Sequence, residues 1–177
     1  MNEVDRTCRG SGGAWLVAPL AVLIGSVPAS AAAATHTLEG NCMLSGGLTF
    51  DRPVGLAPAQ DTFADQASGT CTGTLDGVYR RGTPVVWRAN GSGTIGCLAT
   101  HTTSSGTLTF TALHARIHLL TDAHAVLTQV GATITGAVSG TGVAYVNLQG
   151  DTSACQAGTL TSVDETLTAR TITPLVG

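Results

Sequence analysis

Three of the five histidines lie near one another in the sequence, at His114, His118 and His124. If this segment is a strand, the first two side chains face the same side, and a turn at 121–123 would place His124 beside them. Three imidazoles can bind Zn²⁺ and leave a fourth position open for water. Because Arg116 would project between these ligands and repel the cation, we expect a solvated polar face here, without a metal ion or other cofactor.

The acidic residues offer a second candidate metal site, in a proline-containing stretch at 53–66 that we expect to be a loop with one helical turn near Phe63. Asp61 and Asp65 lie inside this stretch, and two further acids flank it, at Asp51 and Asp76. Carboxylates in a loop are the oxygen ligands that Ca²⁺ prefers. Since their spacing matches no calcium-binding motif, we expect these acids to be solvated instead.

The sequence contains no recognisable catalytic motif. Neither G-x-S-x-G nor S-x-x-K occurs, and the chain has no Lys. Asp164 and Glu165 are adjacent, so in a strand they would point to opposite faces and make a poor acid–base pair. His36 and His101 stand alone among threonines and are expected on the surface. We therefore predict no catalytic residues and a protein that is not an enzyme.

The first 34 residues have the layout of a cleaved secretory signal peptide. Arg6 and Arg9 precede an uncharged apolar run at 14–27, and small residues follow this run up to Ala34. The run is shorter than the roughly 20 residues that a membrane-spanning helix needs. We therefore expect residues 1–34 to be a signal peptide and residues 35–177 to be one secreted, extracellular domain without a transmembrane segment.

Four cysteines remain once the signal peptide is removed: Cys42, Cys71, Cys97 and Cys155. An even number in an exported chain predicts two disulfides, and the separations are too wide for the close pairs that bind zinc. Three connectivities are possible. The one we prefer joins Cys42 to Cys71, because both lie early in the chain, where successive strands usually neighbour each other, and it leaves Cys97 to pair with Cys155.

Composition restricts both the partners and the fold. Only 11% of the 177 residues are charged, the pI is about 5.9 and Lys is absent, so we expect no nucleic-acid binding. After Thr35 the chain is dominated by Thr, Val and Gly, and no segment has clear helical periodicity. Short runs separated by Gly-rich motifs predict an all-β protein: a single antiparallel β-sandwich or flattened barrel with two disulfides. Trp87 is expected in its core.

Several segments can be assigned from their pattern. Residues 106–119 alternate between apolar and polar side chains, with a change of phase after Ala112 that indicates a β-bulge in one continuous strand. Further strands are expected at 124–135 and 142–149, and the Thr-rich segment 158–172 fits a strand better than a helix. Seven Gly-rich motifs are expected to be turns between strands: SGG at 45–47, ASG at 67–69, RRGTP at 80–84, NGSG at 90–93, SSG at 104–106, SGTG at 139–142 and QGD at 149–151.

The order of these Gly, Cys and apolar positions resembles a group of small secreted actinobacterial proteins. The matching pieces follow the signal peptide and cover most of the remaining chain: Gly40–Cys42, Ser45–Phe50, Phe63, Gly69–Leu75, Gly91–Cys97 and Gly106–Phe110. The resemblance implies secretion and an all-β fold. It implies no activity and no site residues.

A stable β scaffold without concentrated chemistry favours a non-enzymatic extracellular or envelope-associated binding or structural module. Its partner would be an extracellular or cell-envelope component. One alternative is a secreted protease inhibitor that presents the 53–66 loop, held rigid by disulfides, to a protease. Another is a metalloprotein or enzyme that uses His114, His118 and His124.

Overall fold

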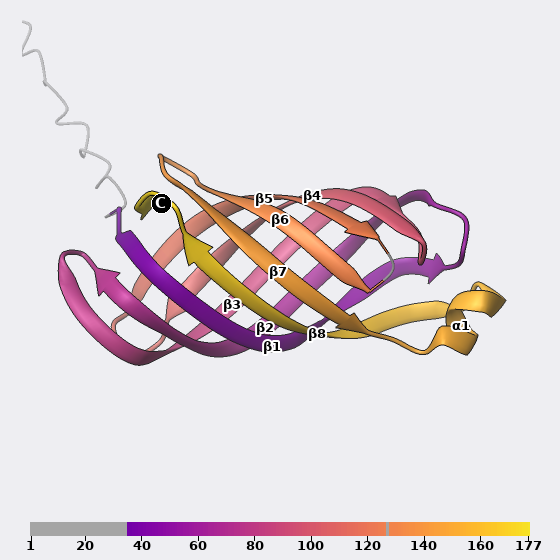
Figure 1. The fold of residues 1–177 in the computed structure, drawn as a ribbon, viewed down its shortest axis with the longest axis horizontal. Coiled ribbons are helices and arrows are strands. Elements are labelled where there is room, and N and C mark those ends of the chain that lie inside the picture. Colours follow the sequence, from indigo (N-terminus) through magenta and orange to yellow (C-terminus); the bar gives the residue numbers. More distant parts are fainter. Residues whose placement is uncertain (1–34, 127) are drawn as a thin grey trace, which may run out of the picture. The chain divides into compact units, whose positions relative to one another are not determined.

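The structure is a computed structural model that describes residues 35–126 and 128–177. The predicted signal peptide at 1–34 lies outside these residues. The described chain forms strands and one short helix (Figure 1), with these bounds: β1 (Thr37–Val54), β2 (Ala59–Leu75), β3 (Val78–Ile95), β4 (Ala99–Phe110), β5 (Ala115–Val126), β6 (Gln129–Gly136), β7 (Thr141–Gln149), α1 (Thr152–Ala157), β8 (Leu160–Thr171) and β9 (Leu175–Val176).

The strands β1 to β8 form a closed antiparallel barrel. Each strand pairs with the next along the chain, and β8 returns to pair with β1, so the sheet has no free long edge (Figure 1). The two-residue β9 pairs with the start of β1. The all-β prediction is therefore confirmed, and of the two architectures expected the structure has the barrel rather than the sandwich. An eight-stranded barrel encloses just enough space for packed side chains or one small ligand.

Five of the seven predicted Gly-rich turns are wrong. SGG and ASG lie inside β1 and β2, RRGTP and NGSG lie inside β3, and SSG lies inside β4. SGTG and QGD do fall at the connections that precede and follow β7. In these strands glycine occupies positions where the neighbouring strand or an interior side chain comes too close for a Cβ atom. The strands are consequently long, up to 18 residues in β1 and β3.

Two predicted features around β4 and β5 are also corrected. Residues 111–114 form a tight turn between these strands, so the phase change after Ala112 marks a hairpin and not a bulge. The predicted turn at 121–123 lies inside β5. The predicted strand at 124–135 is the end of β5 followed by β6, whereas the strands predicted at 142–149 and 158–172 are confirmed as β7 and β8.

The stretch at 53–66 is mostly strand. β1 continues to Val54 and β2 starts at Ala59, which leaves only residues 55–58 as a connection. The expected helical turn near Phe63 is wrong, because this side chain lies in β2 and is buried. The long exposed loop needed for the protease-inhibitor hypothesis is therefore missing from the structure at this place.

The turn between β2 and β3 has the sequence Asp-Gly, which is typical of a β-hairpin. Asp76 and Gly77 join the two strands, and both have positive φ angles, of 51° and 78°. Two such residues form the tight turn whose twist matches a β-hairpin, and Asp-Gly is among its preferred sequences. The Asp76 side chain is held at this corner by the backbone N–H of Thr37 at 2.8 Å and by His36 Nδ1 at 2.8 Å.

Two apolar clusters form the core of the barrel. The larger is built around Phe110, Ile117 and Trp87, and the expected burial of Trp87 is confirmed, since 6% of it is exposed. The smaller contains Val54, Phe63, Ile95, Leu160, Val163 and Cys155. Cys155 belongs to α1, so the smaller cluster lies at the end of the barrel that carries the helix (Figure 1).

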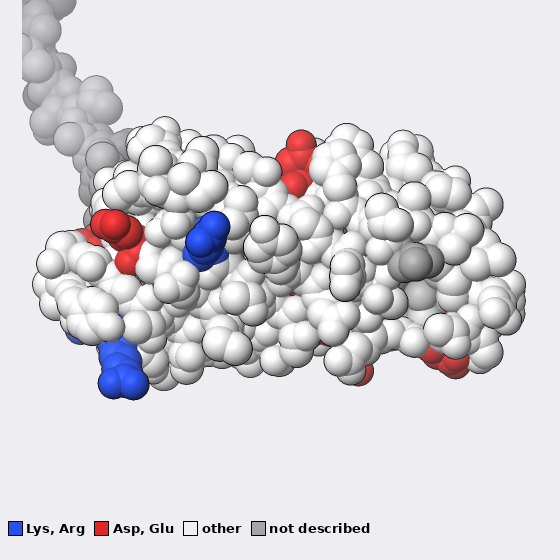
Figure 2. Space-filling model, viewed as in Figure 1, with Lys and Arg blue, Asp and Glu red and all other residues white. Residues whose placement is uncertain are grey.

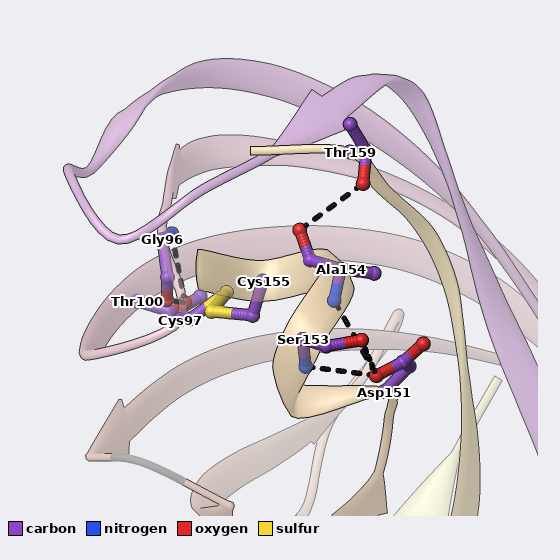
Figure 3. The surroundings of a disulfide bond; sticks show 8 residues. All are labelled: Gly96, Cys97, Thr100, Asp151, Ser153, Ala154, Cys155 and Thr159. Atoms are coloured by element: carbon purple, nitrogen blue, oxygen red, sulfur yellow. Dashed lines mark hydrogen bonds between the residues drawn. A yellow bond between two sulfur atoms is a disulfide. The ribbon is translucent and has the colours of Figure 1, made fainter. Parts of the chain in front are cut away.

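The two disulfides have the connectivity preferred among the three predicted ones. Cys42 and Cys71 are direct partners on β1 and β2. Cys97, in the connection between β3 and β4, is bonded to Cys155 of α1 (Figure 3). Asp151 caps this helix by accepting from the backbone N–H groups of Ser153 and Ala154. The bridge and the cap fix α1 against the barrel end.

Few charges lie on the face of the molecule shown in Figure 2, where acidic and basic side chains are scattered rather than gathered into a patch. Among residues 35–126 and 128–177, no helix is long and apolar enough to cross a membrane.

Candidate binding site inside the barrel

Two carboxyl groups, Asp65 of β2 and Glu165 of β8, face the interior of the barrel between the two apolar clusters. On β2, Asp65 stands between Phe63 of the smaller cluster and Ala67 of the larger one. On β8, Glu165 occupies the corresponding place after Val163 of the smaller cluster. The interior therefore contains one polar layer between two apolar ones.

The pair is brought together across β1. Gly46 is the register partner of Glu165 on one side and of Ala67 on the other, and Leu48 is the register partner of Asp65. A Cβ atom at Gly46 would overlap with the Cα and Cβ atoms of Ala67. Glycine at this position allows β2 to approach β1 closely and leaves no side chain between the two carboxyl groups.

Only part of the hydrogen-bonding capacity of this pair is used. The indole Nε1 of Trp87 donates to Asp65 Oδ2 at 2.7 Å. The other oxygen of this carboxyl, Oδ1, is buried and has no hydrogen-bond partner among the described residues, and the same holds for Glu165 Oε1. Because a buried polar atom without a partner costs roughly 1–3 kcal/mol, two such oxygens at one place indicate a polar site and not ordinary core packing.

Burial and proximity shift the titration of both acids. Glu165 is 4% exposed, and burial together with the negative charge of Asp65 raises its pKa to about 8. Burial also raises the pKa of Asp65, while the hydrogen bonds with Trp87 and with the Glu165 carboxyl oppose this effect. Two interacting carboxyl groups of this kind share a proton near neutral pH, so the pair carries about one negative charge.

Neither carboxyl forms an ion pair with a basic side chain of the described residues, although Arg170 of β8 lines the same cavity. The ion pairs within 35–126 and 128–177 involve Asp76, Asp61 and Asp122, and none involves Asp65 or Glu165. Asp61 shows the contrast on the same strand: burial alone would raise its pKa, but hydrogen bonds from the backbone of Thr62 and Arg52 and the Arg52 guanidinium lower it overall. Asp65 and Glu165 have no such direct ion-pair partner among the described residues.

The carboxyl groups line a cavity of about 140 Å³ whose walls come from all of the strands β1 to β8. Most of the lining side chains are apolar, among them Leu44, Leu108, Leu119 and Ile134. Engineered apolar cavities of about this size admit benzene. The cavity therefore has room for one small molecule with an apolar body.

Glycine also positions the aromatic side chains of the cavity. A Cβ atom at Gly106 of β4 would contact the Trp87 ring at 2.5 Å, and one at Gly91 of β3 would overlap with the Phe63 ring. Both rings consequently lie over glycine backbone on a neighbouring strand. This arrangement fixes the Trp87 indole so that its N–H reaches Asp65.

The histidines selected from the sequence are not brought together as a group. His114 lies in the turn at 111–114 with a φ of 53°, and His118 lies on β5 with its Nδ1 3.0 Å from Thr107 Oγ1. His124, also on β5, stacks instead on His101 of β4. His101 was expected to stand alone on the surface; it is exposed, but the β4–β5 pairing gives it a partner that sequence distance does not reveal.

The four acids considered as calcium ligands have separate environments, and the expectation that they are all solvated is wrong for Asp61, which is buried, and for Asp65, which faces the cavity. Asp51 accepts from the Thr62 hydroxyl, and Asp61 is paired with Arg52. Asp76 is held by His36 and Thr37, while Asp65 alone lines the cavity. The structure therefore does not assemble them into one cluster.

Sequence reasoning missed the Asp65–Glu165 pair, although a signal for it exists. Both acids occupy the inward phase of a strand: Asp65 alternates with Phe63 and Ala67, and Glu165 alternates with Val163 and Leu167. A carboxylate on the apolar face of a strand is the exception that marks a site. The prediction that Asp164 and Glu165 face opposite sides is confirmed, because Asp164 is exposed.

No protein-family model, curated protein or solved structure was found to match this chain.

Proposed function

We propose that this chain is an exported, non-enzymatic binding protein that holds a small amine inside its barrel. The ligand has an apolar body of about six to eight heavy atoms, in keeping with the benzene-sized volume of the cavity. Its ammonium group interacts with Asp65 and Glu165. The observation that carries this proposal is the pair of buried carboxyl oxygens without hydrogen-bond partners on the cavity wall.

Charge selects an amine over other polar ligands. The site carries about one negative charge, because Asp65 and Glu165 interact and no Arg pairs with either of them among the described residues. An ammonium group supplies one positive charge and up to three N–H donors, which match Asp65 Oδ1 and Glu165 Oε1. An anionic ligand of the same shape would be repelled, and a purely apolar one would leave both oxygens unpaired.

The two disulfides support the proposal that the chain is exported. Two disulfides in a chain of this size are typical of oxidising, extracellular compartments. A closed barrel with one end fixed by the Cys97–Cys155 bridge is a rigid container, and rigidity reduces the entropy lost when a ligand binds.

The proposal is tested with cyclohexylamine as the probe and the fluorescence of Trp87 as the signal. The full chain carries Trp15→Phe, which leaves Trp87 as its only Trp. Because the Trp87 indole is bonded to Asp65, an ammonium group at this carboxyl should change its emission saturably. Cyclohexanecarboxylate, which has the same ring and the opposite charge, should have no effect.

Two variants show whether the amine binds at the carboxyl pair. In Asp65→Asn with Glu165→Gln, the amine should bind at least about tenfold more weakly, since the charge pairing is lost and one factor of ten corresponds to about 1.4 kcal/mol. Asp164→Asn removes the exposed neighbouring charge and should bind like the parent chain. Equal binding of amine and carboxylate, or undiminished binding by the double variant, would refute the proposal.

A further inference from the structure

A second group of potential ligands lies on the outside of the barrel, on β4 and β5. His101 and His124 are direct partners across these two strands, and Asp122 stands two residues before His124 on the same face of β5. All three side chains are exposed: His101 by 59%, His124 by 67% and Asp122 by 56%. This cluster is separate from the carboxyl pair, whose side chains face the barrel interior.

The three side chains converge on one point. The two imidazole rings are stacked, with centroids 4.1 Å apart and planes inclined by 13°. Nε2 of His101 lies 3.1 Å and Nε2 of His124 lies 3.5 Å from the same oxygen, Oδ1 of Asp122. One ligand atom from each residue lies within 4.8 Å of the others, so modest side-chain rotations would place all three around a single ion.

The surroundings do not oppose a cation. The register neighbours of the cluster on the adjoining strands are uncharged: Thr94, Thr103, Gly131 and Thr133. Gly131 lies beside His124 on β6, and a Cβ atom there would meet nothing within 4 Å, so this side is open to water and ions. The repulsion that Arg116 would exert between His114 and His118 has no counterpart among these neighbours.

We propose that His101, Asp122 and His124 bind a divalent zinc ion through the Nε2 atoms of the two histidines and a carboxylate oxygen of Asp122. Two imidazole nitrogens and one carboxylate are a ligand set that zinc accepts, and water would complete the coordination. Ca²⁺ and Mg²⁺ prefer oxygen ligands and should bind poorly. On binding, each Nε2 presents its lone pair to zinc, so each neutral imidazole carries its proton on Nδ1, and the ion lies between the two Nε2 atoms and Asp122 Oδ1.

The direct pairing of His101 and His124 across β4 and β5 favours zinc binding. Opposite residues on antiparallel strands have their Cβ atoms about 4.5–5.5 Å apart, so the barrel holds both imidazoles at a fixed separation without ordering a loop. Because only the folded barrel brings β4 and β5 together, zinc should bind the native state and raise its thermal stability.

The test is a calorimetric titration of ZnCl₂ into the full chain, with CaCl₂ as the comparison. One zinc ion should bind, and His101→Ala, His124→Ala and Asp122→Asn should each weaken binding by about tenfold or more, as expected for loss of one ligand in three. His118→Ala is the matched control, since His118 is also on β5 and its ring bonds to Thr107 instead. It should bind zinc like the parent chain.

Two outcomes would overturn the proposal: no zinc binding by the parent chain, or equal losses in His118→Ala and His124→Ala. Melting temperatures with and without zinc check that each variant is folded, because a folded variant retains the cooperative transition of the parent. The double variant Asp65→Asn with Glu165→Gln should retain full zinc binding, so the two sites are tested independently.

Discussion

The indole nitrogen of Trp87 donates a hydrogen bond of 2.7 Å to Oδ2 of Asp65 inside the barrel. Trp87 is on β3 and Asp65 on β2, and both side chains line the same cavity as Glu165 of β8. The bond orients the Asp65 carboxyl and leaves its Oδ1 atom, together with Glu165 Oε1, without a partner among the described residues. The Asp65 side chain is thus fixed in position, but one oxygen of each carboxyl group has no hydrogen-bond partner among the described residues.

Replacing Glu165 by Gln should make stability less dependent on pH. The pKa of Glu165 is about 8 in the folded chain against 4.5 as its ordinary value, so between these limits the native state retains a proton that the unfolded state has lost. The contribution of Glu165 to the free energy of unfolding is fully present below about pH 4.5 and decreases as the pH rises to about 8. Since Gln does not ionise, the stability of Glu165→Gln should fall less than that of the parent between pH 4.5 and pH 8.5, by on the order of a few kcal/mol.

Urea unfolding at pH 4.5 and pH 8.5 measures this difference, with Asp164→Asn as the control. Asp164 is exposed on the opposite face of β8, and its replacement should change stability by less than about 0.5 kcal/mol at either pH. A Glu165→Gln variant that loses stability with rising pH as steeply as the parent would show that Glu165 is not the group responsible.

Adding one methyl group at Gly106 should destabilise the barrel. Its Cβ would meet the Trp87 ring at 2.5 Å and the Cβ of Ala89 at 2.6 Å, so the indole would have to leave its place beside Asp65. Overpacking of this kind costs about 1–3 kcal/mol. Gly131→Ala, where nothing lies within 4 Å, should be neutral or slightly stabilising. The measurement is the denaturation midpoint of each variant, and equal midpoints would contradict the packing described for Trp87.

Removing the Cys97–Cys155 disulfide by replacing both residues with Ser should release α1 from the barrel end. Such losses typically cost about 2–4 kcal/mol. Asp151→Ala, which removes the cap of the same helix but keeps the disulfide, should cost only about 1 kcal/mol. Thermal melting in the absence of reductant compares the two. If the cap variant were the less stable one, the disulfide would not be the main constraint on α1.

The fold class could be predicted from the sequence because its signals are local. Thr- and Val-rich alternation indicates strands wherever they lie, and an even set of cysteines indicates two bridges in any exported chain. The Gly-rich motifs led to wrong turn predictions because the role of each glycine depends on residues that are distant in the sequence. Gly46, Gly91 and Gly106 are needed where another strand or ring approaches, and only the closed barrel determines where that happens.

The two candidate sites were not predicted from the sequence for a related reason. Asp65 and Glu165 are far apart in the chain and meet only because β8 closes on β1, which lies between β8 and β2. His101 and His124 meet because residues 111–114 form a hairpin turn, which sets the β4–β5 register. The inward phase of the two acids could have been read from alternation alone, but their pairing depends on barrel closure.

The most direct test of amine binding is calorimetric titration of cyclohexylamine into the parent chain at pH 7, with cyclohexanecarboxylate as the comparison. Because the ammonium group brings one positive charge to a pair that carries about one negative charge, the amine should bind saturably at a single site and the carboxylate should not bind. The double variant Asp65→Asn with Glu165→Gln should bind the amine at least about tenfold more weakly. Absence of saturable amine binding by the parent chain, or undiminished binding by the double variant, would contradict the account.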